Sequence, residues 1–194
     1  MRLCDILTID RIIVDADGSQ IPNKDAALKK LAELLSPAVS VPQAEVEDLL
    51  TERERLQSTG IGDGVAIPHT ALDHAEQQAS ALILCTRGID FDAIDGKRVH
   101  IVFGVVGPKR ATGEHLRTLA RISRLLRDDH TRARMVAATR RAVNESSGLL
   151  GRGRARDARV VGLRAVERRR VATSDLDHDR EDHRTPLGLL VQEA

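Results

Sequence analysis

The chain has 194 residues and a mass of 21.2 kDa, which suits one domain with some excess length, or at most two small domains. Its 30 basic and 29 acidic residues leave a net charge of +1, and its aromatic residues are two phenylalanines, with no tryptophan or tyrosine. This scarcity argues against nucleic-acid recognition by aromatic stacking and against an aromatic belt at a membrane interface.

The first third of the sequence predicts a strand over residues 11–14 and then two helices. Asn23 suits the N-cap of the first helix, over residues 24–35, in which leucine and alanine recur at helical spacing. Ser36-Pro37 is expected to stop it. The second helix starts at Pro42, because proline is tolerated in a first helical turn.

The middle of the sequence predicts short apolar strands around a glycine-rich turn. The turn, over residues 58–64, leads into a strand over residues 65–67 that is expected to end abruptly at Pro68-His69-Thr70. Residues 79–86 and 99–106 are nearly continuous apolar runs. Such runs are typical of strands that are buried on both faces.

Two more helices are expected before the C-terminal part. The first, over residues 113–127, is amphipathic, and the second spans residues 131–138 and beyond. The inward face of the first is expected to hold Leu116, Leu119, Ile122, Leu125 and Leu126. Helices that alternate with buried strands predict an α/β fold with at least part of the sheet covered on both faces.

The near-neutral net charge is the sum over two parts of the chain that differ in composition. Residues 1–138 hold 18 basic and 20 acidic residues, whereas residues 139–194 hold 12 arginines, no lysine and 9 acidic residues. The second part lacks sustained apolar periodicity, so it buries too little surface to offset the ordering of its backbone. We therefore expect one domain over residues 1–138 and an atypical Arg-rich tail over residues 139–194. Its basic runs alternate with an acidic one, and no nucleic-acid partner is expected.

Neither membrane insertion nor a disulfide framework is indicated. The longest apolar stretches, residues 81–85 and 101–106, are too short to cross a bilayer, and the first residues form no apolar signal core. Two cysteines, Cys4 and Cys85, make neither a disulfide framework nor a four-cysteine metal site. We therefore expect a cytoplasmic protein.

The glycine-rich turn and His69 form the candidate site. The run Gly60-Ile61-Gly62-Asp63-Gly64 is neither a dinucleotide fingerprint nor a P-loop, but its three glycines allow several backbone N–H groups to converge on an anion. His69 follows a short strand, and ligands collect at strand ends in open α/β sheets. Its neutral imidazole is a suitable nucleophile for a phosphoryl group. The alternative for a lone histidine is a structural residue that caps a loop.

Two further residues favour a phosphoryl site. His115 stands in the first turn of a predicted helix, where backbone donors and the helix dipole attract an anion. Arg53 precedes the glycine-rich turn, and its guanidinium can bind a phosphoryl group through two hydrogen bonds. Taken singly, each is an ordinary surface residue; their order along the chain suggests the site.

A zinc site is the competing interpretation of His69. His74 lies five residues further on and Asp73 is adjacent to it, so a His/Asp/His ligand set is conceivable. The spacing fits no known ligand pattern, and no second cluster supports it. We expect no metal.

The order of these residues resembles a known family. Arg53-Glu54, followed by the run from Ser58 to His69, closely resembles IIA components of the bacterial phosphoenolpyruvate-dependent phosphotransferase system. The match is to the fructose/mannitol type, which includes nitrogen-regulatory IIA proteins. Further blocks match at residues 89–96 and 99–106 and at His115, so the resemblance covers roughly residues 3–138. It implies an α/β fold with a mixed β-sheet flanked by helices on both faces.

The resemblance also implies a histidine phosphotransferase role without a cofactor or a metal. His69 is expected to be the phosphoacceptor, through Nε2, and the donor is a phosphorylated HPr-like carrier protein. His115 is expected to stabilise the phosphoryl group and Arg53 to orient it. The expected phosphate-binding loop comprises Thr59, Gly60, Gly62 and Gly64.

The form of the motif is most similar to nitrogen-regulatory IIA proteins, whose phosphorylation state controls the binding of regulatory target proteins. A sugar-specific IIA component that passes phosphate to a IIB component is the alternative. A domain that binds partners without being phosphorylated is a third possibility, which the presence of His69, His115 and Arg53 argues against.

The tail departs from the family. Family members usually end in a short acidic, leucine-bearing helical segment, whereas here the similarity stops near Thr139 and Arg-rich sequence follows. Residues 139–194 are therefore interpreted either as a disordered extension or as the product of a shifted reading frame.

Overall fold

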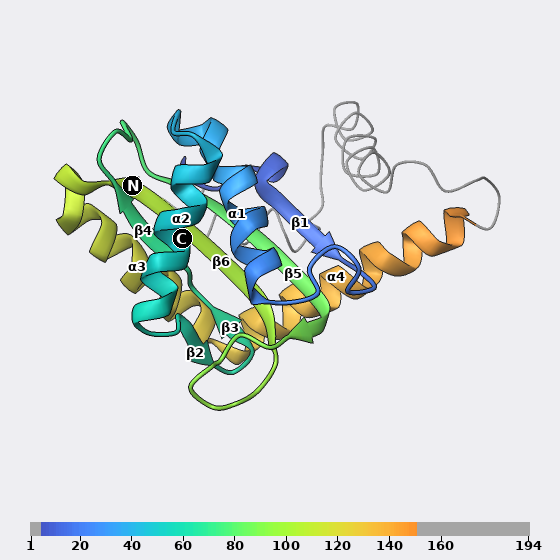
Figure 1. Ribbon diagram of the computed structural model, residues 1–194. Helices are drawn as coiled ribbons and strands as arrows, with labels where there is room; N and C mark the ends of the chain where they lie inside the picture. The colour runs from blue at the N-terminus through green and yellow to red at the C-terminus, as the bar shows by residue number, and fades with distance from the viewer. Residues whose placement is uncertain (1–4, 151–194) are drawn as a thin grey trace, which may run out of the picture.

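The computed structural model describes residues 5–150 (Figure 1). Its six strands form one sheet in the order β1-β5-β6-β3-β2, and β4 also pairs with β6. The strands are β1 (Ile12–Asp15), β2 (Gly60–Gly62), β3 (Val65–Ala66), β4 (His69–Leu72), β5 (Ala79–Ile89) and β6 (Val99–Pro108). The helices are α1 (Lys24–Val39), α2 (Gln43–Leu56), α3 (Thr112–Arg127) and α4 (Asp129–Leu150), and Ile9–Arg11 and Lys109–Ala111 are short 3-10 helices.

The sheet is mixed, as the family resemblance implied. The central strands β5 and β6 are antiparallel, β1 is parallel to β5, and both β3 and β4 are parallel to β6. Helices α1 and α2 lie on one face of the sheet and α3 and α4 on the other (Figure 1). No helix within residues 5–150 is both long and apolar enough to cross a membrane.

Two hydrophobic cores explain why β5 and β6 are apolar along nearly their whole length. Along β5, Ile83 belongs to the core beneath α1 and α2, while its neighbours Leu82 and Leu84 belong to the core beneath α3 and α4. Because successive side chains of a strand point to opposite faces, a strand covered on both faces has no solvent-facing position. The two phenylalanines are divided in the same way, with Phe91 in the first core and Phe103 in the second.

The strand over Val65–Ala66 ends before Pro68, and a second strand that the sequence did not predict begins at His69. Val65 pairs with Ile101 of β6 and, beyond an interruption, His69 pairs with Val105 in the same register. Pro68 lies in the interruption because it has no N–H to donate to the ladder, although its carbonyl accepts from the Val105 N–H at 2.9 Å. The prediction that the first strand ends at Pro68 is confirmed, but the second strand, β4, was not predicted. His69 opens β4.

The glycine-rich segment forms the β2–β3 hairpin. Gly60 is needed for a close approach, because a Cβ there would lie 2.7 Å from the backbone Cα of Ala93. Gly64 has a φ of +77°, in the left-handed region that glycine adopts without steric cost. The segment is thus part of the sheet, and the glycines bring its chain close to the 90–98 connection.

Two details of the helices differ from expectation. Helix α1 continues through Pro37 to Val39, because the proline lies in the last turn and Val39 is buried in the core. Leu116 is 60% exposed rather than inward-facing. Helix α3 instead buries His115, Thr118, Ile122 and Leu126, so its buried face begins one residue earlier than the leucine pattern indicated.

The last described helix crosses the predicted end of the domain. Helix α4 runs without a break past residue 138 to Leu150, and Met135, Ala138 and Thr139 are buried. The remainder of the predicted tail, residues 151–194, lies outside the described residues.

Candidate active site

The imidazole of His69 is held by the backbone two residues before it. Its Nδ1 lies 2.8 Å from the carbonyl oxygen of Ile67. A carbonyl oxygen only accepts hydrogen bonds, so Nδ1 carries the proton and donates it. Nε2 is then the unprotonated nitrogen, and it carries the lone pair that a nucleophile needs.

The fold brings His115 to His69 although the two are 46 positions apart in the chain. Strand β6 runs alongside β4, and the chain then turns through Lys109–Ala111 into the first turn of α3. The two imidazole rings are 6.1 Å apart between centroids and are inclined by 47°. His115 is buried, and a Cβ at Gly107 would lie 3.3 Å from its Nδ1, so the glycine keeps space for the ring.

Gln78 and Thr118 complete the surroundings of His115. The Gln78 Nε2 lies 2.9 Å from His115 Nδ1, and the Gln78 Oε1 accepts a hydrogen bond of 2.9 Å from the Thr118 hydroxyl. The Nε2 of His115 is buried and has no hydrogen-bond partner within the described part of the chain. Gln78 and Thr118 could not be singled out from the sequence, since neither belongs to a catalytic motif.

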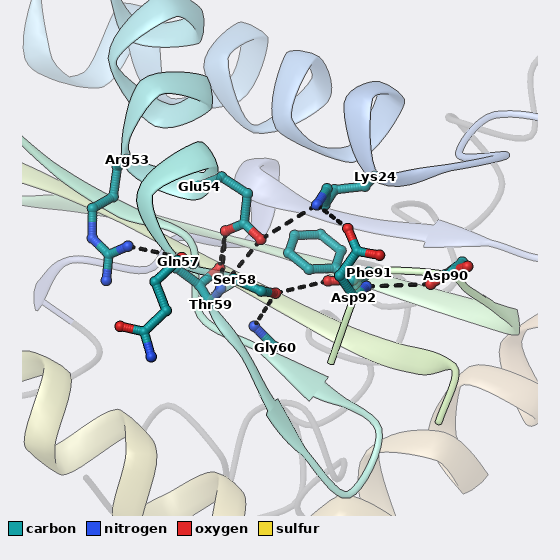
Figure 2. A network of polar contacts seen from close by, with 10 residues as sticks. All are labelled: Lys24, Arg53, Glu54, Gln57, Ser58, Thr59, Gly60, Asp90, Phe91 and Asp92. Atoms are coloured by element: carbon teal, nitrogen blue, oxygen red, sulfur yellow. Dashed lines mark hydrogen bonds and ion pairs between the residues drawn. The ribbon is translucent and has the colours of Figure 1, made fainter. Parts of the chain in front are cut away.

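Arg53 lies near the end of α2, where Figure 2 shows its guanidinium beside Gln57. Its Nη1 donates to the carbonyl oxygen of Gln57 at 2.9 Å. This bond uses one of the five N–H donors of the guanidinium. The charge of Arg53 acts on His69 and lowers its pKa. The structure thus brings His69 and His115 together, whereas a role of Arg53 at the phosphoryl group stays a prediction.

A buried carboxylate connects α2 to the hairpin. Glu54 accepts hydrogen bonds from the Thr59 N–H at 3.0 Å and from the Thr59 hydroxyl at 2.6 Å (Figure 2). Lys24 of α1 lies 3.8 Å from the same carboxylate and also pairs with Asp92. Glu54 therefore connects the end of α2 to the start of the hairpin. It is buried although it belongs to an otherwise polar stretch of α2.

These contacts reach the phosphoacceptor candidate through the backbone. The carbonyl oxygen of Thr59 accepts from the Ile67 N–H at 3.0 Å, and the carbonyl oxygen of Ile67 in turn accepts from His69. One continuous chain of hydrogen bonds thus leads from Glu54 to the imidazole of His69. The orientation of His69 is coupled to the packing of α2.

The expected phosphate-binding loop has structural partners for several of its groups. Both the N–H and the hydroxyl of Thr59 donate to Glu54, and the Gly60 N–H donates to the Ser58 hydroxyl. Gly62 and Gly64 have positive φ angles on either side of the hairpin turn. Direct binding of phosphate by this loop stays a prediction.

The zinc interpretation finds no geometric support. Asp73 pairs with Lys109 at 2.7 Å. No cluster of three or more His, Cys, Asp or Glu side chains suited to a metal ion occurs within residues 5–150.

Burial lowers the pKa of both histidines. Desolvation is the main cause for each, because it disfavours the charged imidazolium. For His69, the charge of Arg53 lowers the pKa further, while the hydrogen bond to Ile67 and the charge of Glu54 oppose the shift. For His115, the proximity of His69 adds to the lowering. Both rings are therefore neutral near pH 7.

We expect an NMR titration to show His69 and His115 protonating below the ordinary value of 6.5. The unfolded chain binds these protons more readily, so the free energy of unfolding should decrease as the pH falls below 6.5. In urea both midpoints should rise to the ordinary value. A native midpoint at or above 6.5 for either ring would contradict the burial argument.

Comparisons with known proteins show the family of the chain. Residues 5–145 match the model of a family described as "Phosphoenolpyruvate-dependent sugar phosphotransferase system, EIIA 2". A nitrogen regulatory protein of Bradyrhizobium diazoefficiens is 37% identical over 128 residues, which cover 66% of this chain and 82% of the relative. A fructose-specific EIIA component of Haloferax volcanii is 31% identical over 139 residues, covering 71% of this chain and 90% of the relative.

A solved structure agrees as well. The nitrogen regulatory protein IIA-Ntr of Neisseria meningitidis superposes with a TM-score of 0.64 at 32% identity, covering 69% of this chain and 90% of the other. The matched region includes the β2–β3 hairpin, both histidines and Arg53. The chain belongs to the EIIA 2 family of the phosphoenolpyruvate-dependent sugar phosphotransferase system.

Proposed function

We propose that this protein is a phosphocarrier whose His69 Nε2 accepts a phosphoryl group from a phosphorylated HPr-like carrier protein. The observation that carries the proposal is the hydrogen bond from His69 Nδ1 to the Ile67 carbonyl, because it leaves Nε2 with a lone pair beside His115. The lowered pKa of His69 adds support, since a protonated imidazole has no lone pair to offer.

The transfer is a single in-line displacement. The lone pair of His69 Nε2 attacks phosphorus, the P–N bond to the donor histidine breaks, and the donor imidazole keeps the electron pair of that bond. Such a reaction needs positioning and charge stabilisation more than covalent assistance. We assign charge stabilisation to His115 on α3 and to Arg53 on α2. A positioned donor of this kind is worth about 2.7–4 kcal/mol in other enzymes.

A nitrogen-regulatory role is the version that we favour, with the phosphorylation state of His69 controlling the binding of regulatory target proteins in the cytoplasm. The similarity to two proteins named as nitrogen regulatory supports it. The 31% identity to a fructose-specific component favours the second candidate, transfer of the phosphoryl group to a IIB component.

The test is to incubate the purified protein with phosphoenolpyruvate, enzyme I and an HPr-like carrier. We expect one acid-labile phosphoryl group, located at His69 by peptide mapping at neutral pH. Adding a fructose IIB domain then separates the two roles: a regulatory protein keeps the label, whereas a sugar-specific component loses it. No label, or a label on another residue, contradicts the assignment of His69.

A further inference from the structure

The environment of His115 contains a feature that the family motif does not account for. Its side chain is only 7% exposed, yet its Nε2 has no hydrogen-bond partner within the described residues. A buried polar group without a partner costs free energy, about 1–3 kcal/mol in general. Such a group is retained where a ligand supplies the missing partner. The identity of that ligand depends on whether Nε2 carries the proton.

The proton on His115 can be located from its neighbours. The Gln78 Oε1 accepts a hydrogen bond from the Thr118 hydroxyl at 2.9 Å, and the NH₂ group of the same amide lies against the imidazole. An amide NH₂ only donates. His115 Nδ1, which lies 2.9 Å from it, is therefore the acceptor and carries no proton. Because burial keeps the ring neutral, its single proton is on Nε2.

We propose that Gln78 is a positioning residue that fixes the Nε2–H tautomer of His115, so that this N–H donates to the phosphoryl group on His69. The inference rests on the proposed function and adds residues to it. Thr118 holds the amide of Gln78, Gln78 sets the proton of His115, and His115 supplies a hydrogen-bond donor to a phosphoryl oxygen. With the ring centroids 6.1 Å apart, one phosphoryl group can contact both rings.

The opposite tautomer of His115 would weaken the binding of the phosphoryl group. With the proton on Nδ1, the lone pair of Nε2 would face the site and repel an anionic oxygen. In other enzymes too, activity falls when a histidine loses the neighbour that sets its tautomer. Gln78 lies in the connection between β4 and β5, and Thr118 lies one turn after His115 on α3. The two residues therefore also link α3 to the sheet beside the site.

The chain offers a matched control. Gln77 is the adjacent residue, is exposed, and donates through Nε2 to the carbonyl oxygen of Ala38 rather than to the site. Gln77→Glu and Gln78→Glu make the same chemical change one position apart. In the second variant a carboxylate faces His115 Nδ1 and accepts a hydrogen bond where the amide donated one, so the proton is expected to move to Nδ1.

The first measurement is of the imidazole tautomers in the unphosphorylated protein by ¹⁵N-resolved NMR. We expect His115 to be Nε2–H in the wild type and in Gln77→Glu, and Nδ1–H in Gln78→Glu. His69, in contrast, should be Nδ1–H in all three. A wild-type His115 that is Nδ1–H would overturn the proposal, whether or not any variant folds.

The second measurement is the initial rate of phosphorylation by the HPr-like carrier. Gln78→Glu should be slower by about 10–100-fold, the usual cost of losing a residue that orients a functional histidine. Gln77→Glu should keep the wild-type rate, and Thr118→Val should fall between the two. Equal rates for the two glutamate variants would overturn the positioning role. A wild type that takes no phosphoryl group would instead contradict the proposed function, because the tautomers are determined without phosphate.

Discussion

Replacing His69 with alanine is expected to abolish phosphorylation by the HPr-like carrier and to leave the protein folded. The variant lacks the only atom proposed to form the phosphorus–nitrogen bond, so the rate should fall at least about 1,000-fold. The fold loses one hydrogen bond, from Nδ1 to Ile67, worth about 1 kcal/mol. Radiolabel transfer measures the first effect, and thermal unfolding followed by circular dichroism measures the second.

His74 provides the control for this experiment. It is exposed and belongs to the connection after β4, so His74→Ala should take up phosphoryl groups at the wild-type rate. Uptake by His69→Ala at a rate close to that of His74→Ala would show that another residue is the acceptor.

Replacing Glu54 with alanine is expected to damage both stability and transfer. The change leaves the Thr59 N–H and hydroxyl buried without their acceptor, at a cost of about 1–3 kcal/mol for each group. The free energy of unfolding should therefore fall by about 2–6 kcal/mol, a large share of the total stability of a domain of this size. Urea denaturation measures the change.

The effect on transfer follows from the hydrogen bonds that connect Thr59 to Ile67 and Ile67 to His69. A loosened hairpin leaves His69 less well oriented, so phosphorylation should slow even at temperatures where Glu54→Ala stays folded. Glu52→Ala, at an exposed position on the same helix, should change the stability by no more than about 0.5 kcal/mol. Similar losses for the two variants would show that the buried carboxylate has no special role.

The sequence predicted those parts of the fold where local pattern and tertiary position agree. The apolar runs of β5 and β6 indicate burial on both faces because no residue in them has to face water. His69, His115 and Arg53 could be named because the family motif contains them. Their proximity could not be derived from spacing, since it depends on the parallel pairing of β4 with β6.

Other features depend on long-range contacts that produce no recognisable pattern in the local sequence. The pairing of β4 could not be predicted because Pro68 suggests the end of a strand. The register of the strands on either side of Pro68 is set by their pairing with β6. Glu54 looks like one of several charges on α2, and it is buried only because Thr59 folds back onto it. Leu116 fits an apolar stripe, but the helix is rotated so that His115 and Thr118 face the sheet. Gln78 belongs to a connection without periodicity, and its role depends on α3.

The interruption between β3 and β4 has a consequence for signalling. Because β3 and β4 share one register on β6, the chain is fixed on both sides of Pro68, and Val105 holds the proline carbonyl between them. This pairing holds the backbone on both sides of Pro68 against the same strand. Phosphorylation of His69 adds about 1.5–2 negative charges at one fixed point of the surface. In the proposed regulatory role, a partner distinguishes the two states by sensing that charge, and its discrimination should weaken as salt screens it.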